Sequence, residues 1–118
     1  GAKGRLETGV TVTWDFHDFP GAFPVNVVEI VPDEKIILTW EAGSKGDGTG
    51  SYDTTVTMVF APLDDNTRTL VSITEEGWKE TEKGLKASYG NCEGWTGMLA
   101  AMKAYVEHGI NLREGFYK

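Results

Sequence analysis

Glu75 is the residue of this sequence best placed to do chemistry. It shares the parity of Val71 and Ile73 in an alternating segment, so continued alternation turns its side chain toward the buried face of a sheet. A carboxylate there needs hydrogen-bond partners, and it can serve as a general base or as the polar anchor of a binding site. A solvated Glu75 at the strand end is the alternative, and the commoner one. Glu29 follows two valines in the same manner and is a second candidate for the interior, although its strand looks buried on both sides or poorly phased.

The residues of nucleophilic and metal chemistry are few and scattered. The single cysteine, Cys92, and the two histidines, His17 and His108, are expected at a helix start, a strand end and a helix end, so a catalytic triad is hard to assemble. None of them has the spacing of metal ligands. A thiol at a helix N-terminus suits nucleophilic chemistry, but a small buried structural cysteine is the commoner alternative. We therefore predict no catalytic residue, no metal and no cofactor.

Strands must position these residues, and alternation of apolar and polar side chains predicts five of them. Their ranges are 10–17, 24–31, 35–41, 52–61 and 68–76. Turns are expected at residues 19–22 and 32–34, and such short connections permit only antiparallel neighbours. The glycine-rich residues 43–50 are expected to form a hairpin tip. They do not suit a phosphate-binding loop, because a strand and not a helix follows them.

One amphipathic helix is predicted over residues 92–108. Its apolar residues recur four, three and four positions apart, at Trp95, Leu99, Met102 and Val106. Asn91 suits the N-cap, and Gly109, which follows His108, suits the C-terminal end. Residues 77–90 show no sustained period and are expected to be a long loop, with room for one helical turn at residues 80–85.

The predicted fold class is α+β, an antiparallel β-meander of about five strands packed against one long C-terminal helix. The 118 residues fit a single domain. The net charge of −7 and the 11 scattered basic residues argue against nucleic acid and anionic membranes as partners. A lone cysteine, and no apolar run long enough to span a membrane, predict a cytoplasmic location.

Two segments resemble a known family. They are TLVSITEEGW at residues 69–78 and GWTGMLAAMKAYVEHGINL at residues 94–112. Their order and spacing resemble the C-terminal half of the START-like (SRPBCC) superfamily, in the branch related to the activator of heat-shock protein 90 ATPase. The second segment carries that branch's helix pattern, here Gly94, Trp95, Leu99, Met102, Lys103 and Tyr105. The resemblance implies a helix-grip fold over residues 4–112. The N-terminal strand and helix of the family have no counterpart here, so we expect an exposed sheet edge and a homodimer that covers it.

The resemblance also implies a ligand site, an apolar cavity between the sheet and the helix. The residues expected to approach it are Trp14, Phe16, Trp40, Met58, Glu75, Trp95, Met98, Leu99 and Met102. The alternative is that these apolar side chains fill a solid core, which such patterns do more often.

Three functions follow from the resemblance. The first is binding of a hydrophobic small molecule such as a lipid, a polyketide or an aromatic metabolite. The second is a protein-interaction module with a chaperone partner. The third, with least support, is a cyclase-like or hydrolytic enzyme that uses Glu75 as its general base.

Overall fold

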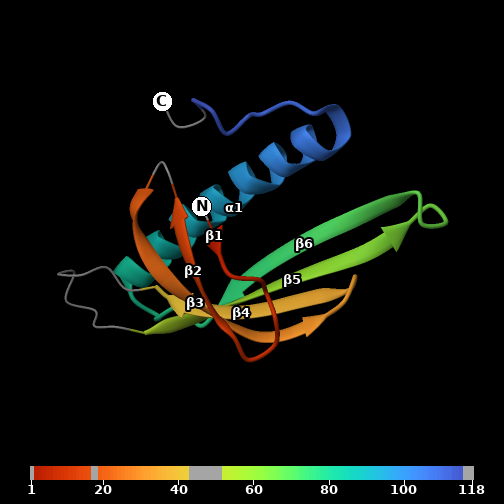
Figure 1. The fold of residues 1–118 in the computed structure, drawn as a ribbon. Coiled ribbons are helices and arrows are strands. Elements are labelled where there is room, and N and C mark those ends of the chain that lie inside the picture. Colours follow the sequence, from red (N-terminus) through yellow and green to blue (C-terminus); the bar gives the residue numbers. More distant parts are fainter. Residues whose placement is uncertain (1, 17–18, 43–51, 116–118) are drawn as a thin grey trace. The chain divides into compact units, whose positions relative to one another are not determined.

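The computed structural model describes residues 2–16, 19–42 and 52–115, and the chain divides into two compact units, Gly1–Trp78 and Lys79–Lys118. The first unit is a six-stranded sheet in which strand order follows the chain and all neighbours are antiparallel (Figure 1). The strands are β1 (Ala2–Lys3), β2 (Thr11–Phe16), β3 (Phe19–Val31), β4 (Lys35–Glu41), β5 (Asp53–Leu63) and β6 (Arg68–Glu76). The antiparallel meander predicted from the short connections is confirmed.

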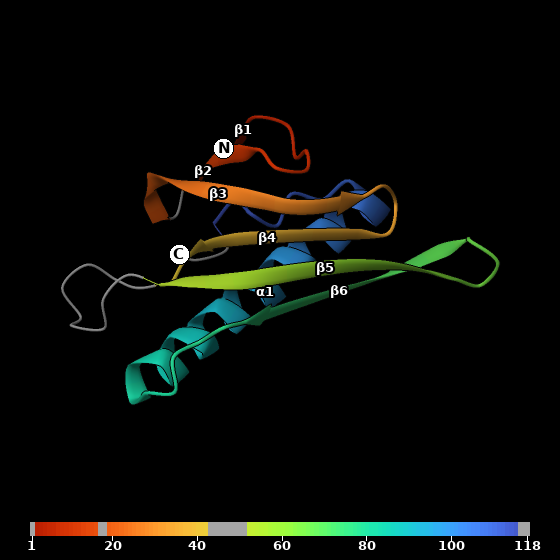
Figure 2. The same ribbon diagram turned by 90° about the horizontal axis from the view of Figure 1, so that it is seen from below.

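The predicted strand bounds agree best with the observed ones in the later strands of the sheet. Strands β4 and β6 have the predicted bounds, whereas β5 begins one residue later and ends two residues later than predicted. The two-residue β1, which pairs with Thr13 and Trp14, is absent from the prediction. The predicted hairpin tip at residues 43–50 and His17 lie outside the described residues. Seen from below, β2 to β6 lie side by side in chain order, and the β5–β6 hairpin projects past β4 (Figure 2).

The turn predicted at residues 19–22 is wrong, because β3 already begins at Phe19. Proline suggested the turn, but a strand tolerates proline where it has a neighbour on one side only. In the described residues β4 pairs only with Asn26–Val31 of β3, so the earlier part of β3 pairs with β2 alone. Gly21 lies there at φ 130°, in a backbone region that favours glycine.

A β-bulge at Val28 corrects the expectation for Glu29. Val27 lies opposite Leu38, but Glu29 lies opposite Ile37, so one extra residue on β3 reverses the alternation. Glu29 therefore turns away from the face of Leu38. Its side chain is 46% exposed and pairs with Lys35 at 3.4 Å. The bulge is also the reason that the strand looked poorly phased in the sequence.

One face of the sheet carries the buried side chains. They are Val12, Val25, Val27, Leu38, Thr54, Val56 and Met58. Residues directly opposite each other on neighbouring strands share a face. Val12 lies opposite Val25 and Leu38 lies opposite both Val27 and Val56, so these side chains form one continuous surface, called here the buried face.

The second unit contains the helix α1 (Glu82–His108). It begins ten residues before the predicted start, so the loop expected at residues 77–90 is wrong from Glu82 onward. The N-cap is Thr81 and not Asn91: the Thr81 Oγ1 accepts a hydrogen bond from the Gly84 N–H at 3.0 Å. Glycines in the first half of the helix obscured its period in the sequence.

The C-terminal end of α1 is as predicted. Gly109 adopts φ 69° and ψ 17°, and its N–H donates to the Tyr105 carbonyl at 2.9 Å. Cys92 lies inside the helix and is exposed, which corrects both the helix-start position and the buried structural role expected for it. Within the described residues, no helix combines the length and the apolarity that crossing a membrane requires.

Candidate functional site

Four aromatic side chains of the sheet form a closed circuit of ring contacts, called here the aromatic cluster: Trp14, Phe16, Phe23 and Trp40. The ring centroids lie 6.1 Å apart for Trp14 and Phe16, and 5.5 Å apart for Phe16 and Phe23. They lie 5.6 Å apart for Phe23 and Trp40, and 5.8 Å apart for Trp40 and Trp14. The ring planes are inclined by 53° to 89°, so ring edges approach ring faces, which is the favourable arrangement.

The strands place the aromatic cluster on the buried face. Trp14 lies two residues after the buried Val12 on β2, and Trp40 lies two residues after the buried Leu38 on β4, so both share the direction of those residues. Phe23 lies directly opposite Trp14 on β3. All four rings are half-buried, so each keeps some surface that another molecule can contact.

A carboxylate lies at the border of the aromatic cluster. The Trp40 Nε1–H donates to Glu75 Oε2 at 3.0 Å, and the Thr54 hydroxyl donates to the same oxygen at 2.6 Å. Trp40 lies opposite Thr54, and Glu75 lies opposite Val56, so three adjacent strands contribute one residue each. These three residues, Trp40, Thr54 and Glu75, are called here the Glu75 anchor. Two donors on one oxygen hold the carboxylate in a fixed position.

The end of β6 is fixed so that Glu75 keeps the predicted direction. The Trp78 Nε1–H donates back to the Glu75 carbonyl at 3.2 Å. Gly77 between them adopts φ 96°, which turns the chain sharply after the strand. Glu75 is therefore half-buried on the buried face, as its parity with Val71 and Ile73 predicts, and is not turned outward at a frayed strand end.

The structure brings four of the nine predicted site residues together, namely Trp14, Phe16, Trp40 and Glu75. Met58 lies on the same face but further along β5, opposite Ile36 and Ile73, and is 9% exposed. Their role in ligand binding stays a prediction. The other four, Trp95, Met98, Leu99 and Met102, are half-buried on α1. They belong to the second unit, so their approach to the sheet also stays a prediction.

Two residues of the site were missed by sequence reasoning. Phe23 fell in the segment after the wrongly predicted turn, and only the register with Trp14 reveals it. Thr54 carried a signal: it has the same parity as Val56 and Met58, and a hydroxyl on an apolar face needs a partner. An acceptor on the neighbouring strand was therefore to be expected.

Other surface features offer less chemistry. A groove of about 410 Å³ lies beside the β3–β4 turn, between Ile30, Ile36, Phe60 and Thr69. In the described residues no three histidine, cysteine or acidic side chains gather as metal ligands.

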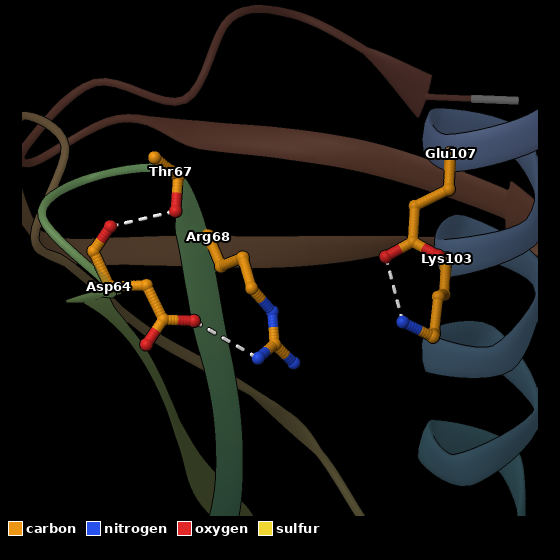
Figure 3. A network of polar contacts seen from close by, with 5 residues as sticks. All are labelled: Asp64, Thr67, Arg68, Lys103 and Glu107. Carbon is orange, nitrogen blue, oxygen red and sulfur yellow. Dashed lines mark hydrogen bonds and ion pairs between the residues drawn. The ribbon is translucent and has the colours of Figure 1, made fainter.

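Exposed ion pairs occur on both units, and Figure 3 shows two of them. At the β5–β6 turn, Arg68 pairs with Asp64 at 3.1 Å, and the Thr67 hydroxyl donates to the Asp64 carbonyl at 2.7 Å. On α1, Lys103 pairs with Glu107 at 2.7 Å. Such solvated pairs contribute little to the free energy of unfolding of the chain. Their effect is confined to one turn and to one helix.

Comparisons with known proteins agree with the fold. Residues 2–107 match the sequence model of a family described as "Activator of Hsp90 ATPase homolog 1-like protein". A crystal structure of a protein from Staphylococcus saprophyticus is 26% identical, with a TM-score of 0.72, over 95% of this chain and 72% of that one. A crystal structure of a protein from Mesorhizobium loti is 18% identical, with a TM-score of 0.65, over 80% of this chain and 65% of that one. No curated protein matches the sequence.

Proposed function

Because the chain belongs to the family of activator of Hsp90 ATPase homologue 1-like proteins, whose fold is START-like, we propose that it binds a hydrophobic small molecule on the buried face of its sheet. A ring or chain of the ligand contacts the aromatic cluster, and a polar group of the ligand meets the Glu75 anchor. The binding partner is a lipid, a polyketide or an aromatic metabolite.

The observation that carries this proposal is the Glu75 anchor at the border of the aromatic cluster. Small-molecule sites are mostly apolar, with a few polar groups in fixed positions that orient the ligand. Here four half-buried rings supply the apolar area, and Glu75 supplies a carboxylate that Trp40 and Thr54 hold in place.

Titration with the neutral, fluorescent and hydrophobic probe N-phenyl-1-naphthylamine tests the proposal. We expect saturable binding to the full chain, weakened about tenfold in Phe23→Leu, since loss of one aromatic contact corresponds to roughly this factor. Val59→Ala is the matched control, because Val59 is 41% exposed and lies on the opposite face from Met58. Circular dichroism confirms that both variants fold. Absence of binding, or equal weakening in the two variants, contradicts the proposal.

The family description supports a second candidate function. It names activation of the Hsp90 ATPase, which is the activity of a protein that binds a chaperone. The test is the rate of ATP hydrolysis by purified Hsp90 with and without this chain. An increased rate that persists in Phe23→Leu favours a protein-interaction module over ligand binding, and an unchanged rate removes this candidate.

A further inference from the structure

We propose that two copies of this chain join along β6, which pairs antiparallel with the β6 of its partner about a two-fold axis at Ser72. The inference goes beyond ligand binding and does not depend on it. It names the edge and the register of the homodimer that the sequence leads us to expect. Three features of β6 support it: its free edge, the exposure of its side chains, and the order of its charges.

The first feature is the edge of β6. The strand pairs with β5 over nine residues without a shift in register, and within the described residues it has no neighbour on its other side. Natural sheets protect an edge strand with proline, a bulge, charged residues or a short length. The central segment TLVSIT at residues 69–74 has no charge and no proline. Nothing along it hinders the addition of another strand.

The opposite edge of the described sheet is less suited to a partner. There β1 covers β2 at Thr13 and Trp14, and the register of β2 against β3 shifts between Trp14 and Phe16. Such irregular pairing twists a strand and disfavours addition of a further one. A second copy therefore finds a regular edge at β6.

The second feature is the exposure of the β6 side chains. None of its residues is buried, although Ile73 lies opposite the buried Met58 of β5. Val71 and Ile73 are half-buried on the buried face, and Leu70 on the other face is 51% exposed. A strand laid against β6 covers apolar surface of these three residues on both faces of the sheet, which favours association.

The third feature is the order of the charges. When β6 pairs with its copy about Ser72, positions equally far from Ser72 lie opposite each other. Arg68 then lies opposite the partner's Glu76, and the symmetry forms this pair twice. Arg68 and Glu76 are both exposed. Arg68 already pairs with Asp64 at 3.1 Å, but a guanidinium has five N–H donors and can bind two carboxylates. Opposite charges directly across two strands stabilise the pairing.

The other symmetric registers nearby fit less well. An axis at Val71 places Arg68 opposite the partner's Thr74 and leaves both glutamates beyond the partner's strand. An axis at Ile73 places Leu70 opposite the partner's Glu76. Only the axis at Ser72 uses the whole of β6, and it also places Val71 opposite the partner's Ile73 on the same face.

A charge exchange tests the pair. Sedimentation velocity measures the dimer affinity of the full chain, and we expect Arg68→Glu to weaken it about tenfold, because two like-charge contacts replace two attractive ones. Glu76→Arg should weaken it similarly. The double variant Arg68→Glu/Glu76→Arg restores both pairs in reverse and should restore the affinity of the unaltered chain.

Lys103→Glu is the matched control for charge. It changes the net charge by the same amount as Arg68→Glu, and it likewise disrupts an exposed pair between residues four apart, on α1. We expect it to leave the dimer affinity unchanged. Circular dichroism verifies that each variant folds.

A disulfide tests the position of the axis. Directly opposite residues of antiparallel strands have Cα atoms about 4.5–5.5 Å apart, within the range that a disulfide bridges. Cys92→Ser first removes the exposed natural thiol. In that background, oxidised glutathione should link Ser72→Cys chains into dimers, which non-reducing electrophoresis detects.

Val59→Cys in the same background is the control for this test. Val59 lies opposite Ser72 on β5, so it shares the face of Ser72, and it is 41% exposed. In the proposed dimer three strand spacings, about 14 Å, separate it from its copy, which is too far for a disulfide. We therefore expect no linked dimer.

The outcomes decide the inference without reference to a ligand. A chain that stays monomeric at every concentration overturns it. A dimer in which the double variant is as weak as Arg68→Glu, or in which Lys103→Glu is equally weak, has no Arg68–Glu76 pair and also overturns it. Equal linking of Ser72→Cys and Val59→Cys places the dimer contact elsewhere. In each of these cases probe binding to the aromatic cluster, and with it the proposed function, is unaffected.

Discussion

Thr54 is a threonine on an apolar face, and its side chain is fully buried with 0% exposure. Its hydroxyl donates to Glu75 at 2.6 Å, so the two residues satisfy each other. Thr54→Val keeps the shape and removes the donor. We expect a loss of about 1–2 kcal/mol in the free energy of unfolding, because a buried acceptor then loses a partner. Urea denaturation measures it.

Thr57→Val is the control for this prediction. Thr57 lies on the same strand, opposite Ile37, and therefore on the other face of the sheet. We expect the free energy of unfolding of the Thr57→Val variant to differ from that of the unaltered chain by less than about 0.5 kcal/mol, as for most surface substitutions. Equal losses in the two variants would show that the hydroxyl of Thr54 has no special role.

Sequence reasoning found part of the site at this scale. Glu75 was predictable because strand alternation continues to the end of β6, where Gly77 and Trp78 fix the chain. Phe23 was not, because its place opposite Trp14 depends on register, which follows from long-range pairing and not from local pattern.

At the scale of the element, we predict different effects on stability when three glycines of α1 are replaced by alanine. A Cβ on Gly90 or Gly94 meets nothing within 4 Å, so Gly90→Ala and Gly94→Ala should each stabilise the chain by about 0.5–1 kcal/mol, the helix preference of alanine over glycine. A Cβ on Gly84 would overlap the Lys79 carbonyl oxygen. Gly84→Ala should therefore lower the melting temperature, and thermal circular dichroism compares the three variants. A melting temperature raised by Gly84→Ala would contradict the close contact at the helix start.

The N-cap of α1 allows a second prediction at this scale. Thr81→Ala removes the acceptor for the Gly84 N–H, which should cost about 1 kcal/mol in the free energy of unfolding. Thr96→Ala is the matched control, since the exposed Thr96 only donates to the Cys92 carbonyl within the helix. Removing that bond should cost nothing measurable. Urea denaturation measures both free energies of unfolding. A larger loss in Thr96→Ala than in Thr81→Ala would contradict the role of Thr81 as the N-cap.

The sequence predicted the C-terminal half of α1 and missed its N-terminal half, and the reason lies in the local signals of the two halves. Its C-terminal half has an apolar stripe and an end at Gly109, and both are local signals. Its N-terminal half depends on the Thr81 cap, and the glycines at 84 and 90 weaken the propensity on which a sequence prediction relies. Strands β4 and β6 were predicted to the residue, and from Leu70 onward β6 alternates cleanly between more and less buried side chains.

At the scale of the whole molecule, we predict that two copies of the chain associate. The two-residue β1 pairs with only part of β2, and β6 lies at the other edge of the sheet in the described residues. Exposed edges are sites for strand pairing between chains. Sedimentation velocity over a wide range of protein concentration should show a homodimer. A single monomeric species at every concentration would contradict the expectation.

The bulge at Val28 divides β3 into two halves whose alternation differs by one residue, with Val25 and Val27 on the buried face before it and Ile30 after it. Deleting the codon of Val28 would join the halves into one regular strand in which Val27, Glu29 and Ile30 keep their present directions. Single-residue deletions in the middle of a paired strand ordinarily reverse every side chain beyond them. Here the surplus residue is already present, so a chain of 117 residues should fold with the same sheet.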